Sequence, residues 1–227
     1  MDKKRSLILS ATPLEPTELA TVFSDQTNSI RRKLEVPPKL RDDGWGLGTG
    51  DQAKFLQGEL ISVESHRMTI DLYRDGSLIF LGGVSRDFLA WSDPKDLRIH
   101  PLALVELTVN FTRFYQEVLK DFRVRPQRIG FKAELRNMHL SNQKTTLRAG
   151  TVQDFQYGSY GVPNEAPDDD WSKEIVVASE GYDPDLVAYS LLRELYLWFG
   201  HADEAIPYTK EVDGITVIDA DTIAKIR

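Results

Sequence analysis

Hydrophobic and polar residues alternate in several short segments of this 227-residue chain, and these segments predict β-strands. Three of them, Phe55–Val63, Arg67–Tyr73 and Ser77–Leu81, follow one another and are rich in β-branched and aromatic residues. The turn between the second and the third contains Asp75-Gly76, a pair that tolerates positive φ. The pattern therefore predicts an antiparallel meander.

Four further segments are predicted as strands. In Arg128–Leu135 every second residue is apolar, which is typical of a strand with one buried face. We expect this strand to join the meander in one sheet. Shorter strands are predicted at Ser6–Ser10, Glu174–Ala178 and Ile215–Ile218.

Three segments repeat their apolar residues at intervals near 3.6, which predicts helices. The longest, Leu102–Phe122, begins behind a proline at the first helical position. Leu186–Phe199 follows an Asp-Pro-Asp start at Asp183, which supplies a cap, a proline and a first-turn acid. Thr17–Leu34 is the third predicted helix.

Together these elements predict one α+β domain over residues 1–227, with an antiparallel sheet packed against two main helices. The two helices are Leu102–Phe122 and Leu186–Phe199. The segment 155–172 is rich in glycine, proline and aspartate, so we expect a mobile loop there.

The composition excludes several classes of protein. Hydrophobic residues make up 41% of the chain and charged residues 28%, which is ordinary for a globular protein. The chain has no cysteine, so disulfides, thiolate zinc sites and cysteine nucleophiles are excluded. No apolar stretch approaches the ~20 residues that a membrane span needs, and no signal peptide is recognisable. We therefore expect a cytoplasmic location.

Charge is sorted along the chain. Residues 112–148 carry nine bases and three acids, a net charge of +6. Residues 150–227 carry sixteen acids and five bases, a net charge of −11. A basic middle beside an acidic last third indicates either a site for a partner or an internal charge match.

No catalytic motif is present at the required spacing. The glycines of Gly44–Gly50 lack both the dinucleotide spacing and the lysine of a P-loop, so we interpret them as a tight loop that Trp45 fixes to the core. The four histidines form no metal-ligand pair. Metal-dependent nucleases of the restriction type have one residue between an acid and a lysine on a strand. Here two residues separate Asp170, the last acid of Asp168–Asp170, from Lys173, so the spacing is one residue too long. A metal-dependent nuclease remains an alternative. We expect no cofactor, no metal and no catalytic residue.

The basic middle provides the only candidate binding residues. Arg128, Lys132 and Arg136 lie on one face of the predicted strand, because alternate residues point the same way. Three cations on an exposed face could contact phosphates, whereas the alternative is that the acidic last third neutralises them. The candidate phosphate or nucleic-acid contacts are Arg123, Arg125, Arg128, Lys132 and Arg136.

Four segments resemble the C-terminal accessory region of bacterial Schlafen-type proteins, which are Alba-fold DNA-binding proteins. Lys39–Leu47 is similar to an Arg-x-x-Gly-Trp segment, and Leu72–Gly76 to a hairpin that follows it. Pro101–Glu106 looks like the proline-led helix of that region, and Val124–Leu135 like its basic linker and strand. The resemblance covers Ile8–Leu140.

This resemblance implies a bacterial, cytoplasmic module linked to defence or regulation that acts beside a nucleic-acid-binding part. The Alba-fold domain itself has no counterpart in this sequence, so its activity does not carry over, and the resemblance names no site residues. We therefore expect a non-catalytic interaction or sensor module whose partner is a protein or a second copy of the chain. A nucleic-acid-binding accessory domain that uses the basic strand 123–136 is the first alternative.

Overall fold

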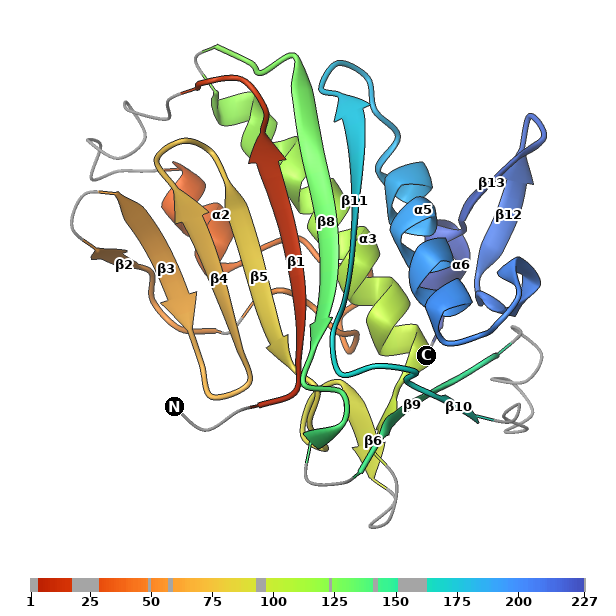
Figure 1. The fold of residues 1–227 in the computed structure, drawn as a ribbon. Coiled ribbons are helices and arrows are strands. Elements are labelled where there is room, and N and C mark those ends of the chain that lie inside the picture. The colour runs from red at the N-terminus through yellow and green to blue at the C-terminus, as the bar shows by residue number, and fades with distance from the viewer. Residues whose placement is uncertain are drawn as a thin grey trace.

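The structure is a computed structural model in which helices and strands form two main layers (Figure 1). It describes eight ranges of the sequence: 4–17, 29–48, 50–56, 59–92, 97–122, 124–140, 143–150 and 163–226.

The first layer is a seven-stranded sheet in the order β11-β8-β1-β5-β4-β3-β2. Every neighbouring pair in it is antiparallel. Its strands are β1 (Ser6–Pro13), β2 (Lys54–Leu56), β3 (Leu60–Glu64), β4 (Met68–Tyr73), β5 (Leu78–Gly83), β8 (Arg128–Arg136) and β11 (Trp171–Ala178).

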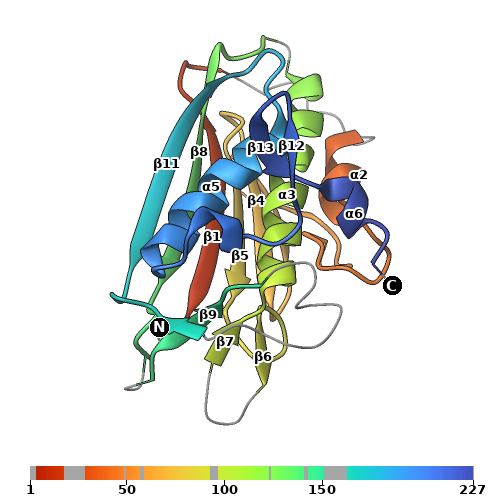
Figure 2. The same ribbon diagram turned by 90° about the vertical axis from the view of Figure 1, so that its right-hand side faces the viewer.

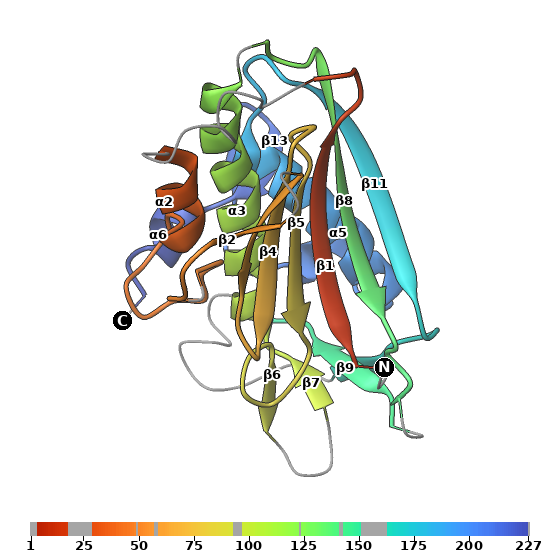
Figure 3. The same ribbon diagram turned by 90° about the vertical axis from the view of Figure 1, so that its left-hand side faces the viewer.

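The second layer consists of helices, which all lie on the same side of this sheet (Figures 2 and 3). They are α2 (Ser29–Glu35), α3 (Pro101–Val118), α5 (Pro184–Trp198) and α6 (Ala220–Ile223). The opposite face of the sheet carries no helix in the described parts of the chain. The predicted α+β class, with an antiparallel sheet against two main helices, is confirmed, and α3 and α5 are the two longest.

The core lies between the two layers. On β8, Ile129, Phe131, Ala133 and Leu135 are buried, and alternate residues point to the open face. Fifteen of the eighteen residues of α3 are buried, because α3 is enclosed by the sheet on one side and by other helices around it. The side chains of α5 are buried where it packs on α3, on β13 (Ile215–Ile218) and on β11.

Two smaller sheets complete the fold. The first has the order β10-β9-β7-β6 and includes one parallel pair, β7 with β9. Its strands are β6 (Ala90–Ser92), β7 (Leu97–Ile99), β9 (Thr145–Arg148) and β10 (Pro163–Glu165). The second is the hairpin of β12 (Thr209–Val212) and β13 (Ile215–Ile218). The described residues also include 3₁₀ turns at Leu119–Asp121 and Asp203–Ala205.

Some predicted bounds are corrected. The single strand predicted over Phe55–Val63 is wrong, because β2 and β3 are two antiparallel strands in that region. The strand predicted at Ser6–Ser10 extends to Pro13, and the one at Glu174–Ala178 starts at Trp171.

Two further predictions fall partly outside the described residues. Of the helix predicted over Thr17–Leu34, Ser29–Leu34 forms part of α2, Thr17 is not helical, and residues 18–28 lie outside the described ranges. Of the loop predicted over 155–172, residues 155–162 lie outside the described ranges. The rest contains β10 and the first two residues of β11. No described helix is long and apolar enough to span a bilayer.

Candidate functional site

The predicted basic strand is β8, and its cations lie on the open face of the large sheet. Arg128 is exposed, and Lys132 and Arg136 are partly exposed. Arg125 is exposed in the segment that leads into β8, and Arg123 lies outside the described residues.

Each of the three cations on β8 already has an acidic partner. Arg128 Nε lies 2.9 Å from Glu15 Oε1, and Lys132 Nζ lies 2.9 Å from Glu134 Oε1. Arg136 is paired with the other oxygen of Glu134 and lies 3.6 Å from Asp170 Oδ2. The positive charge of this face is therefore largely neutralised within the chain.

Glu134 is central to this neutralisation because it lies between Lys132 and Arg136 on the same face of β8. Partial burial acts to raise the pKa of its carboxyl, but the hydrogen bonds from the two cations outweigh that effect and hold the pKa below its ordinary value. The carboxylate therefore stays ionised at neutral pH. A phosphate that approached Lys132 would meet this fixed negative charge as well.

The acidic run before β11 supports a turn. Asp170 Oδ1 accepts a hydrogen bond from Asn137 N at 2.9 Å, and Asp169 Oδ1 accepts one from His139 N at 3.0 Å. These carboxylates cap the turn that follows β8, where Asn137 has a φ of 60°. In the parts of the chain that the structure describes, no group of three His, Asp or Glu side chains could hold a metal ion.

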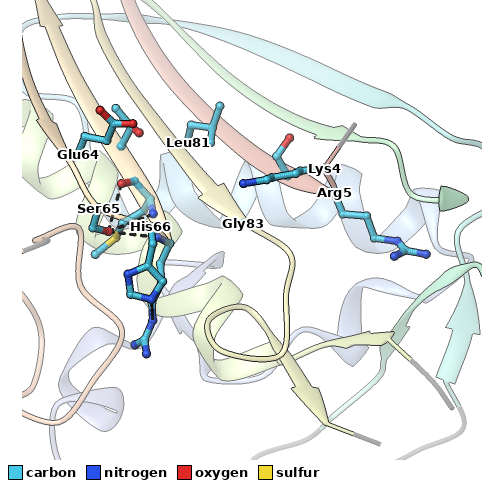
Figure 4. Close-up of a pocket in the computed structure, with 11 residues that line it drawn as sticks. Lys4, Arg5, Glu64, Ser65, His66, Leu81 and Gly83 are labelled. Carbon is cyan, nitrogen blue, oxygen red and sulfur yellow. Dashed lines mark hydrogen bonds between the residues drawn. The ribbon is translucent and has the colours of Figure 1, made fainter. Parts of the chain in front are cut away.

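A basic pocket of about 570 Å³ opens where β1 begins and β4 starts (Figure 4). Its cations do not converge on one point. The guanidinium of Arg5 extends away from the side lined by Glu64 and His66, and its Nη2 donates to the carbonyls of Leu140 and Gln143. His66 Nε2 lies 3.6 Å from Asp87 Oδ2. The geometry does not assemble an anion site.

The free edge of β11 is the most distinctive surface. Among the described residues, β11 is the last strand of the sheet and pairs with β8 alone. Ser179 N donates to Gln127 O at 2.9 Å, which continues the β8–β11 register. Hydrogen-bonded residues alternate in an antiparallel ladder. The odd-numbered residues of β11 therefore bond to β8, and the even-numbered residues direct their N–H and C=O groups outward.

The β1–β8 ladder supports this assignment. Leu14 N donates to Arg128 O at 3.1 Å, so even-numbered residues of β8 bond to β1 and odd-numbered ones are left for β11. The outward backbone groups of β11 belong to Ser172, Glu174, Val176 and Ala178. All four of these residues are exposed.

A groove of about 550 Å³ runs along the second half of this edge, between β11 and α5. β11 contributes Ile175, Val176, Val177 and Ala178, and the start of α5 contributes Leu186, Val187 and Ser190. Tyr182 also lines it; this side chain is buried, and its hydroxyl donates to Thr112 O at 2.9 Å. An apolar slot therefore borders the unpaired backbone.

Side-chain contacts close the first half of the same edge. Lys173 Nζ lies 3.0 Å from Glu194 Oε2, and the Trp171 and Trp198 rings are 6.1 Å apart between centroids. These contacts fix α5 along the helix-facing side of β11. The second half has no such ion pair or ring contact in the described chain, and Ile175 and Val177, which are partly buried against the core, line the groove there.

The end of the groove is acidic. Glu180 and Asp183 line it, and Glu180 is exposed. Asp183 also caps α5, since its Oδ1 accepts from Asp185 N at 2.8 Å. Asp185 is engaged elsewhere, with its Oδ2 2.7 Å from Arg113 Nη2. A ligand in the groove would therefore meet negative charge at the carboxyl end of β11.

Sequence patterns predicted a strand at Glu174–Ala178 and a helix at Leu186–Phe199 but did not identify the groove between them. The one signal in the sequence is the charge distribution within β11: Lys173 and Glu174 lie in its first half, and Ile175–Ala178 carries no charge. Whether a strand lies at an edge depends on the order of the strands, which the sequence does not show.

No protein-family model, no curated protein and no solved structure matches this chain.

Proposed function

We propose that this protein is a non-catalytic interaction module that binds a protein partner through the free edge of β11. The observation that carries the proposal is the backbone of Ser172, Glu174, Val176 and Ala178, which no strand in the described parts of the chain pairs, alongside an apolar groove. An exposed strand edge is a template for a further strand. Main-chain hydrogen bonds would supply affinity, and the groove would supply selectivity.

Natural proteins usually protect exposed edges with charged residues. Lys173 and Glu174 do so in the first half of β11, whereas Ile175–Ala178 has no such protection. Val176 is 53% exposed although it is apolar. The unprotected half coincides with the groove, which favours a binding surface over an edge that is merely tolerated.

Nucleic-acid binding through β8 has less support. Lys132 and Arg136 share Glu134, and Arg128 is paired with Glu15. The net charge of −7 also repels phosphate backbones at long range. The resemblance to the Schlafen-type accessory region adds the proposal that a nucleic-acid-binding part acts beside this module, in a bacterial defence or regulatory protein.

Two variants at one position test the edge. Val176→Pro removes one outward N–H without breaking the β8 ladder, because the Val176 N–H does not point to β8. Val176→Thr keeps the N–H and changes only an exposed side chain. The tagged chain and both variants are compared by quantitative affinity purification, and a purified partner is then tested directly by hydrogen exchange.

We expect a partner that is retained by the unmodified chain and by Val176→Thr and lost with Val176→Pro. Amides of residues 171–178 should become protected in the purified complex. If every bound protein is retained equally by both variants, binding does not use the edge and the proposal is wrong.

A further inference from the structure

We infer that the groove beside β11 takes a single extended peptide segment of a partner, with apolar side chains at alternate positions and a Lys or Arg at one end. This inference rests on the proposed function and names the class of partner. Three observations on the described residues support it: the match between the groove and the periodicity of an added strand, the overhang of α5, and the charge at the end of the groove.

The first observation is the match between groove and strand periodicity. An added strand would lie about 4.8 Å from β11, and its alternate side chains would point to the same face. On the helix side, they would enter the slot bounded by Ile175 and Val177 from β11 and by Leu186 and Val187 from α5. On the open side, they would face solvent. An alternation of apolar and polar residues fits both surroundings.

The second observation is that α5 extends past the edge of the sheet. In Figure 1, α5 lies beyond β11 on the side away from β8, and Figure 2 shows it next to β11 on the side of the sheet that carries the helices. A strand added to β11 would therefore rest on α5. The helix provides a floor for an added segment, so the segment needs no helix of its own.

The same overhang disfavours a second copy of the chain as the occupant. If two β11 strands paired antiparallel about a two-fold axis, the helices of both copies would lie on the same face. Each α5 would then extend beneath the β11 of the other copy. That space is already occupied by α5 and α3, which pack on one another. A segment without an attached helix layer avoids this overlap.

The third observation is electrostatic. Glu180 and Asp183 lie where the groove ends, and the nearest cation of β11, Lys173, is held by Glu194 in the other half of the strand. A basic side chain at one end of the segment would complement these acids. The two acids would therefore favour a segment with a basic end over a segment that is apolar along its whole length.

Short labelled peptides provide the test, with fluorescence anisotropy as the measurement. Two heptapeptides alternate Val and Thr and carry one Lys, either at the amino end or at the carboxyl end. Because Glu180 and Asp183 lie at the carboxyl end of β11, the first should bind if the segment is antiparallel and the second if it is parallel. Matched peptides carry Glu in place of Lys, and a further pair is N-methylated at alternate amides.

We expect one Lys peptide to bind saturably and its Glu counterpart to bind more weakly. Val176→Pro should weaken binding by about fivefold or more, the effect of losing one hydrogen bond, and Val176→Thr should leave it unchanged. N-methylation on the side that faces β11 should abolish binding, which tests the same hydrogen bonds without altering the protein. Glu180→Lys should reverse the preference between Lys and Glu peptides.

Three results would overturn the inference. A dimer that light scattering detects in the unmodified chain and not in Val176→Pro would show that a second copy occupies the edge. If a folded partner binds in an edge-dependent way but no peptide does, the peptide class is wrong while the proposed function stands. If neither peptides nor proteins distinguish Val176→Pro from Val176→Thr, both proposals fail.

Discussion

The guanidinium of Arg41 forms an ion pair with the carboxylate of Glu106, and both side chains are removed from solvent. Arg41 Nη2 lies 3.3 Å from Glu106 Oε2, and the side chains are 11% and 1% exposed. Glu106 Oε2 also accepts a hydrogen bond from Trp45 N at 3.0 Å. The pair therefore fastens the glycine-rich loop to the second turn of the buried helix α3.

Removal of one partner of this pair should be costly. We expect Glu106→Gln to lower the free energy of unfolding by about 3 kcal/mol, because it leaves the buried charge of Arg41 without its counter-ion. Chemical denaturation measures the change. The matched control is Glu117→Gln, which removes an exposed partner of Lys120 on the same helix and should cost less than about 0.5 kcal/mol. Equal losses in the two variants would contradict the assigned role of Glu106.

His100 should make stability depend on pH. Burial, together with the positive charge of Arg41, lowers the pKa of His100 to about 4. Its Nδ1 accepts from Ala103 N at 3.3 Å, which requires the neutral ring. In the unfolded chain the pKa is about 6.5, so between these values only the unfolded state binds the proton. Stability is therefore lost as the pH falls from 6.5 to 4, by up to about 3 kcal/mol.

The measurement is the free energy of unfolding at several pH values between 4 and 7. His100→Asn keeps an acceptor at the helix cap and removes the titrating ring. We expect this variant to be less stable than the unmodified chain at pH 7 and to show a flatter pH dependence over this range. An unchanged slope would show that other groups cause it.

The hairpin between β4 and β5 should not tolerate a side chain at Gly76. This residue has a φ of 83°, and a Cβ built there would lie 2.1 Å from Phe122 Cζ. We expect Gly76→Ala to cost about 3 kcal/mol, from backbone strain and from displacement of the buried ring. Gly214→Ala isolates the strain, because Gly214 has a φ of 75° and open space around it. That variant should cost about 1 kcal/mol, and thermal unfolding compares the two.

We expect no nucleic-acid binding through β8, so charge reversal on this strand should change nothing in a binding assay. Because Arg128 and Lys132 are already paired with Glu15 and Glu134, we expect no gel shift of duplex DNA or RNA at 150 mM salt with either the unmodified chain or the variant Arg128→Glu with Lys132→Glu. A salt-dependent shift by the unmodified chain that the double substitution abolishes would instead support the nucleic-acid alternative.

Local patterns predicted the elements with strong periodicity. The cap at Asp183, the proline at the start of α3 and the alternation in Arg128–Leu135 each act over a few neighbouring residues, so the sequence contains the whole signal. The division between β2 and β3 was missed, although the polar residues and glycine of Gln57-Gly58-Glu59 separate the two apolar stretches. The sheet of β6, β7, β9 and β10 was also missed, because its strands of three or four residues are too short for a clear period and one pair joins segments far apart in the sequence.

The sequence also showed that positive and negative charge are separated along the chain, and the structure shows how they meet. Arg136 contacts Asp170, and Arg113 contacts Asp185, as the internal match requires. Other partners were not foreseen. Glu15 comes from the N-terminal segment, and Glu134 comes from the basic strand itself. Net charge over a range of residues does not identify the pairs that folding brings within contact distance.

By itself the sequence determined which segments of this protein form its main strands and helices, because hydrophobic periodicity and end signals are local properties. Only the tertiary structure decided that β11 ends the sheet, that α5 extends past it, and that an apolar groove lies between them. The order of strands is set by contacts between residues far apart in the chain. The free edge of Ser172–Ala178 is a consequence of that order.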